Sequence, residues 1–84
     1  MELYSERYFQ HFKGGLYKLL FIAKDSESIE KVVVYQAMYG RFDIWVRPEK
    51  RFFDFVNLNE EEIPRFKELT KEEFLCLQSK IENI

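Results

Sequence analysis

The sequence has little of several residue types on which whole classes of protein depend. Its 84 residues include one cysteine, one histidine, three glycines and two prolines. The single cysteine excludes a disulfide within the chain and fits a reducing compartment. The single histidine excludes a metal site built from a Cys/His cluster, because such a site needs three or four ligands. We therefore expect no disulfide, no bound metal and no cofactor.

Long apolar runs are also missing. No stretch reaches the roughly 18 apolar residues that a membrane-spanning helix needs. The first residues, MELYSERYFQHF, lack the basic start and apolar run of a secretory signal peptide. The sequence therefore predicts a cytoplasmic protein.

Aromatic residues are plentiful instead. Nine Phe, five Tyr and one Trp make up 18% of the chain. A chain of this length forms one small domain and buries only about 60% of the surface that its unfolded form exposes. Because each buried aromatic ring removes roughly 150–250 Å² from water, a few of these rings can form its core.

The charges are unevenly distributed along the chain. The net charge is −2, yet residues 7–54 carry nine Lys or Arg against six Asp or Glu. Negative charge gathers in the run Glu60–Glu62 and in the terminal segment, and the run itself predicts a solvated loop. The basic excess is far from the clustered basic stripe that is typical of nucleic-acid binding proteins.

Several segments have the pattern of β-strands. They are rich in β-branched and aromatic residues, alternate between two faces, and are separated by Gly-containing or polar turns. Residues 49–51 could add one helical turn after Pro48, which cannot donate a ladder hydrogen bond. The predicted strands are residues 15–24, 31–39, 44–47 and 52–56, with 63–67 as a possible fifth.

A helix is predicted at the end of the chain. Thr70 and Glu73 have the spacing of a capping box, and four apolar residues follow at helical spacing, namely Phe74, Leu77, Ile81 and Ile84. Residues 1–69 would form a β domain, and residues 70–84 a helix packed on that domain or on a partner. The fold class is therefore mainly β, a small antiparallel barrel of four to five strands with a C-terminal amphipathic helix.

Three blocks of sequence resemble a known family. They are HFKGGLY at residues 11–17, VVYQAMYG at 33–40 and WVRP at 45–48. In this order they are similar to the bacterial family called domain of unknown function 1653, over about residues 8–66. The resemblance implies an SH3-like β-barrel and no activity, because the family's function is unassigned. The chain departs from the pattern at Asp25, where family members usually carry a His.

Candidate binding residues lie in and beside the segment 32–48. Tyr35, Tyr39 and Trp45 could stack on a base, a proline-rich peptide or a methylated cation, or could pack in the core with the tyrosine hydroxyls at the surface. Gln36 lies on the opposite face of its strand and needs a partner, either internal or a ligand, because an unsatisfied buried amide costs about 1–3 kcal/mol.

Arg47 has two interpretations. Its planar guanidinium could bind a carboxylate or phosphate through two hydrogen bonds, or it could pair with Glu27 or Glu30 inside the protein. With the aromatic residues it defines a tentative binding surface. The tentative ligand-binding residues are Gln36, Tyr39, Trp45, Arg47, Lys13 and Arg65.

Two reactive side chains also have alternatives. His11 could act as a general base or metal ligand, or could be bonded to backbone near the first strand. Cys76 as a nucleophile would need a neighbouring base, whereas its position beside the apolar stripe favours a buried structural role. Lys13, Gly14 and Gly15 superficially resemble a phosphate-binding loop, but the rest of that motif is absent.

Three classes of function remain open. The preferred one is a non-catalytic binding module for a nucleotide or nucleic acid. The alternative is a structural or protein-interaction domain that binds a peptide or a second copy through Phe74, Leu77, Ile81 and Ile84. An enzyme is the third, with Asp25, Glu27 or His11 as a general base beside Arg47, and it requires these residues to converge.

Overall fold

Short strands joined by tight turns account for most of the chain. The computed structural model describes residues 6–82, and within them seven strands and two helices follow one another. The elements are β1 (Arg7–His11), β2 (Leu16–Lys24), β3 (Lys31–Ala37), β4 (Ile44–Pro48), α1 (Glu49–Phe52), β5 (Phe55–Leu58), β6 (Glu61–Pro64), β7 (Phe66–Leu69) and α2 (Lys71–Glu82).

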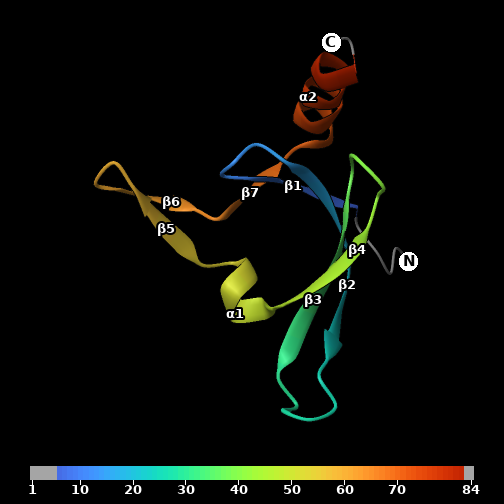
Figure 1. Cartoon of the computed structure of the whole chain (residues 1–84), viewed down its shortest axis with the longest axis vertical. Coiled ribbons are helices and arrows are strands. Elements are labelled where there is room, and N and C mark those ends of the chain that lie inside the picture. Colours follow the sequence, from blue (N-terminus) through green and yellow to red (C-terminus); the bar gives the residue numbers. More distant parts are fainter. Residues whose placement is uncertain (1–5, 83–84) are drawn as a thin grey trace.

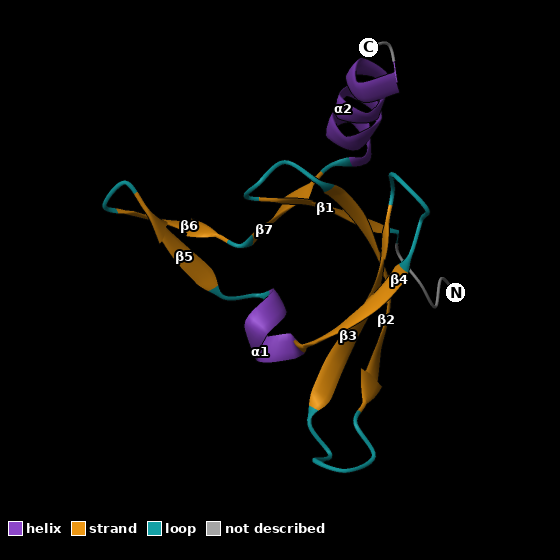
Figure 2. Ribbon diagram, in the orientation of Figure 1, coloured by secondary structure: helices purple, strands orange, loops and turns teal. Residues whose placement is uncertain are grey.

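The strands form one antiparallel sheet and a separate hairpin. The sheet has the order β4-β3-β2-β1-β7, while β5 and β6 pair with each other and project from the side (Figure 1). The mainly β class with a C-terminal helix is confirmed. The strand number is larger than predicted, and within the described residues β4 and β7 are free edges, so the sheet does not close into a barrel (Figure 2).

One face of the sheet, called here the inner face, carries the larger part of the core. Phe9 of β1, Val33 and Tyr35 of β3, and Phe66 of β7 are buried there with Phe52 of α1. The ring of Phe52 stacks on that of Phe66 at a centroid distance of 4.1 Å. Because strand residues alternate between faces, the next residues along each strand point to the other side, the outer face. Helix α1 follows β4 at one edge of the sheet, and its Phe52 packs against Phe66 of β7 at the other edge. The helix therefore connects the two edges of the curved sheet.

Helix α2 covers part of the outer face. The ring of Phe74 stacks on that of Tyr8 at 4.1 Å, and Leu77 packs against the same buried cluster. The predicted capping box is confirmed, since the N–H of Thr70 donates to Glu73 at 2.8 Å and the N–H of Glu73 donates to Thr70 at 3.1 Å. The first part of the predicted stripe is thus used within the domain. Ile84 and the side chain of Ile81 lie outside what the structure describes.

Several predicted boundaries are wrong for identifiable reasons. Strand β1 escaped prediction because Tyr8 and Phe9 are adjacent and are both buried, one on each face of a strand paired on both sides. Phe52 ends α1 instead of beginning a strand, and Arg65 separates β6 from β7 where one strand was predicted.

Two further predictions, the burial of Cys76 and the loop at the acidic run, are also wrong. Cys76 is exposed on α2, so the predicted burial of this residue is wrong. Glu61 and Glu62 begin β6 instead of lying in a loop, although both remain exposed. In the described part of the chain, no helix is long and apolar enough to cross a membrane.

Candidate functional site

Strand β4 places an aromatic ring and a cation on the inner face. Its register sets Trp45 opposite Tyr35 and Arg47 opposite Val33, so both side chains share the face of the main core. Trp45 is 52% exposed, whereas Tyr35 is buried among other aromatic rings. The guanidinium carbon of Arg47 lies 5.6 Å from the ring centroid of Phe66. A stacking surface and a cation are therefore available on the side of the sheet that α1 partly covers.

The buried Nε atom of Arg47 lacks a hydrogen-bond partner among residues 6–82. None of the ion pairs found among these residues involves Arg47, so the predicted alternative of pairing with Glu27 or Glu30 is not realised. An unsatisfied buried donor costs about 1–3 kcal/mol, and it favours a bound group that can accept a hydrogen bond.

Three cations gather around His11. Burial lowers the pKa of the His11 imidazole, and the nearby charges of Arg47, Arg65 and Lys13 lower it further. The backbone N–H of Lys13 donates to His11 Nδ1 at 3.1 Å, so the neutral ring carries its proton on Nε2. The interpretation of His11 as a backbone-bonded residue is confirmed, and its second nitrogen is a hydrogen-bond donor.

Arg65 is the one of these cations that has a carboxylate partner in the structure. Its Nε and Nη2 atoms donate to the Asp54 carboxylate at 2.6 and 3.2 Å. This hydrogen bonding lowers the pKa of Asp54, and the charges of Arg65, Arg47 and Arg51 add to the effect. One carboxylate therefore faces several cations, and the neighbourhood of Arg47 keeps an excess of positive charge.

Two tyrosines meet beside the turn that follows β1. The hydroxyl oxygens of Tyr17 and Tyr39 are 2.5 Å apart, and the ring of Tyr17 packs edge-on against Phe66. Burial, followed by the hydrogen bond with Tyr39, strongly raises the pKa of the Tyr17 hydroxyl. Because the Tyr17 hydroxyl stays protonated at neutral pH, it can donate a hydrogen bond but does not serve as a base.

Gly15 fits tightly between these rings, and Gly15→Ala is expected to separate them. An added Cβ would lie 3.1 Å from Tyr17 Cε2 and 3.1 Å from Tyr39 Cε1. Overpacking of this kind typically costs about 1–3 kcal/mol of unfolding free energy. Spectrophotometric titration should also show the pKa of Tyr17 falling toward its ordinary value. Tyr39→Phe is the control, since it removes the hydroxyl partner without crowding, and unchanged stability and titration of Gly15→Ala would contradict the prediction.

The lowered pKa of His11 predicts a pH-dependent stability. Since the folded-state pKa lies below the unfolded-state value of about 6.5, the unfolded chain takes up the proton first as the pH falls. The free energy of unfolding should therefore decrease from pH 7 downward, by at most about 1.4 kcal/mol per pH unit for this one proton. NMR titration of the ring measures the midpoint directly, and His11→Gln should lose this part of the pH dependence. A midpoint at or above the ordinary value would contradict the assignment.

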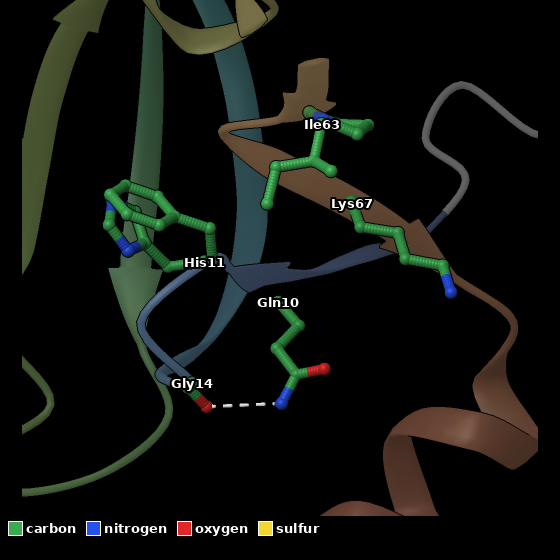
Figure 3. A pocket seen from close by; sticks show the side chains of 7 residues that line it. Gln10, His11, Gly14, Ile63 and Lys67 are labelled. Atoms are coloured by element: carbon green, nitrogen blue, oxygen red, sulfur yellow. Dashed lines mark hydrogen bonds between the residues drawn. The ribbon is translucent and has the colours of Figure 1, made fainter. Parts of the chain in front are cut away.

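A pocket of about 490 Å³ has His11 in its lining. Its walls come from the end of β1, the turn that follows it, β6 and β7, and Figure 3 shows Gln10 and His11 leaving β1 in different directions. Gln10 donates to the carbonyl of Gly14 at 3.2 Å, which fixes one wall. The lining residues are Gln10, His11, Phe12, Gly14, Ile63, Pro64 and Lys67. Gln10 and Lys67 are cross-strand partners on the outer face, whereas Arg47 is on the inner face, so His11 is the residue that links the pocket to the cations.

The sequence-predicted residues separate into two groups. Trp45, Arg47 and Tyr39 belong to the inner face or its rim, and Lys13 and Arg65 lie close enough to His11 to lower its pKa. Gln36 is on the outer face, where its amide donates to the carbonyl of Phe42 at 2.9 Å. Its required partner is therefore internal, and the structure does not bring it to the others.

Sequence reasoning missed Tyr17 and Phe66 as parts of this site. Both contact His11 by their ring edges, at centroid distances of 6.5 and 4.9 Å. Alternation in the predicted strand at 15–24 could have placed Tyr17 on one face, but pairing of β1 with β7 was needed to bring Phe66 to it. The proposed base Asp25 instead accepts the N–H groups of Glu27 and Ser28, at 2.7 and 3.2 Å, in the projecting β2–β3 hairpin.

Fold and site together define a small, mainly β domain with an aromatic and cationic inner face. Its membership is shown by a family model described as protein of unknown function (DUF1653), which matches residues 7–68. The chain therefore belongs to the DUF1653 family, as the resemblance of the three sequence blocks predicted. It is also similar to the crystal structure of a DUF1653 protein from Bordetella bronchiseptica, with 29% identity, a TM-score of 0.67, and coverage of 80% of this chain and 88% of that one. A comparison with curated proteins found no match.

Proposed function

We propose that this domain is a non-catalytic binding module for an anionic, aromatic ligand of the nucleotide or single-stranded nucleic-acid class. The observation that carries the proposal is the buried Nε atom of Arg47, which lacks a partner among the described residues and lies above Phe66. A phosphate or carboxylate oxygen would satisfy this donor. Guanidinium groups bind such oxygens more strongly than they bind neutral acceptors.

The surrounding groups favour phosphate with an attached base. Lys13 and Arg65 supply further positive charge near His11, and exposed Trp45 offers a ring on which a base can stack. The net charge of −2 argues against a long duplex, which requires an extended basic surface. The proposed ligand is therefore short, with one or a few phosphates engaged at the inner face.

Fluorescence of Trp45 provides the direct test, because this is the chain's one tryptophan. The intact protein is titrated with nucleoside monophosphates and with short single-stranded oligonucleotides at two salt concentrations. We expect saturable quenching that weakens at high salt, since phosphate contacts release counterions. If no compound quenches Trp45 or binds with salt dependence in a parallel calorimetric titration, the proposal fails.

Arg47→Met identifies the residue responsible. Loss of a bidentate contact to an anion is expected to weaken binding about 5- to 150-fold, which corresponds to about 1–3 kcal/mol for such contacts. Lys80→Met is the matched control, because it removes one positive charge from an exposed residue of α2, the helix that packs on the outer face. Equal losses for the two variants would show that only the overall charge matters.

A further inference from the structure

The free edge of β4 exposes apolar residues on both of its faces. Ile44, Trp45 and Val46 are 60%, 52% and 66% exposed. Among the described strands β4 pairs with β3 alone, so one side of its backbone remains unpaired. An exposed, apolar edge strand is a template for pairing with another chain, and natural proteins normally protect such edges.

The pattern of backbone hydrogen bonds between β3 and β4 shows which backbone groups of β4 face the free edge. The N–H of Ala37 donates to the carbonyl of Asp43 at 2.9 Å, in the same register that sets Tyr35 opposite Trp45. Hydrogen-bonded pairs alternate along an antiparallel ladder, so the backbone groups of Asp43, Trp45 and Arg47 face β3. Those of Ile44 and Val46 therefore face away from it, toward an edge that no other described strand pairs with.

Opposite charges select one register for two antiparallel copies of this strand. With Trp45 opposite Trp45 of the second copy, Asp43 faces Arg47. A shift by two residues in either direction loses this pair of opposite charges, because it sets either Asp43 or Arg47 opposite Trp45. Odd shifts would place inward-facing and outward-facing backbone groups together.

We propose that two copies of this chain associate by antiparallel pairing of their β4 strands, with Trp45 opposite Trp45. Ile44 of each copy then exchanges hydrogen bonds with Val46 of the other, and Pro48, which has no N–H, is not needed as a donor. The two Trp45 rings meet at a non-hydrogen-bonded position, where side chains lie closest across strands. The β4 edge is preferred to α2 for this association, because Phe74 and Leu77 of α2 already pack on the sheet.

The interface between the two copies is small, and its size determines how tightly the copies are expected to associate. A stable dimer normally buries about 1,200–2,000 Å² in total, whereas pairing through one short strand covers less. Association should therefore be weak and concentration-dependent. The pairing uses Trp45 and Arg47, which the proposed anion site also uses, so ligand titrations of Trp45 are made at concentrations where sedimentation shows a monomer.

Two measurements on the intact chain test the pairing. Sedimentation velocity over a wide concentration range should show a sedimentation coefficient that rises from monomer toward dimer. Over the same range, circular dichroism should develop an exciton couplet between indole rings. Since each chain has one Trp, such a couplet requires two chains whose tryptophans are in contact.

Three variants separate this edge from other surfaces. Val46→Pro removes the outward N–H, Asp43→Lys places a cation opposite Arg47 of the second copy, and Val46→Thr keeps the N–H and the β-branched shape. The first two should lower association at least about 10-fold and abolish the couplet, while the third retains both. A monomer at every concentration would overturn the proposal. So would a dimer that shows no couplet and that forms equally well in the Val46→Pro and Asp43→Lys variants. The proposal is also overturned if β4 pairs with an added extended peptide but not with a second copy of the chain.

Discussion

Phe52→Ala is expected to lower the free energy of unfolding by about 3–5 kcal/mol, the usual cost of removing a fully buried Phe ring. The side chain of Phe52 has no solvent exposure. Its ring stacks on Phe66 at 4.1 Å and meets Phe9 and Tyr35 edge-on at 5.0 and 5.2 Å. Removal of this ring leaves a cavity where α1 contacts both β1 and β7, and backbone of neighbouring strands cannot easily collapse into it.

This loss is large against the whole stability of the domain. At roughly 0.05–0.15 kcal/mol per residue, 84 residues give about 4–13 kcal/mol. Urea denaturation followed by far-UV circular dichroism measures the change. Phe55→Ala is the matched control, because Phe55 is 60% exposed and should change the stability by less than about 1 kcal/mol. Equal losses in the two variants would contradict the assigned role of Phe52.

Phe52 also illustrates what local sequence predicts and what it does not. Strands β2 and β3 and the start of α2 follow from nearby residues, namely alternating apolar side chains and the Thr70–Glu73 capping box. Phe52 was predicted to begin a strand, since its aromatic neighbours favour extended structure. Its actual place at the end of α1 depends on packing against Phe9 and Phe66, which lie far away in the sequence.

The candidate site shows the same division. Residue types in the sequence identified Arg47, Trp45, Lys13 and Arg65 as candidates, because planar cations and exposed rings suit anionic aromatic ligands. Lys13 is near His11 along the chain, but the approach of Arg47 and Arg65 to His11 depends on the pairing of β1 with β7 and on the contact of α1 with both, which no local pattern predicts. Gln36 failed as a candidate for a similar reason, since the hairpin carbonyl that satisfies it becomes available only after β3 and β4 pair.

Arg47→Met is expected to leave the free energy of unfolding unchanged or to raise it by up to about 1–2 kcal/mol, while binding of the anionic ligand is lost. The substitution removes a buried Nε donor that lacks a partner in the described structure, and with it a penalty of about 1–3 kcal/mol. It also removes the cation above the ring of Phe66, a contact worth about 0.5–1 kcal/mol at exposed sites. Methionine keeps most of the apolar stem, so the packing against Phe66 largely survives.

The sign of the stability change separates a binding residue from a structural anchor. An anchoring Arg47 would stabilise the fold, and its replacement would cost several kcal/mol, as removal of one partner of a buried charge pair does. Chemical denaturation of the wild type and of Arg47→Met without ligand decides between these cases. Functional sites often hold polar groups that reduce stability until a ligand satisfies them. A marked destabilisation by Arg47→Met would therefore show that Arg47 maintains the sheet, and the anion-binding role of the inner face would lose its main support.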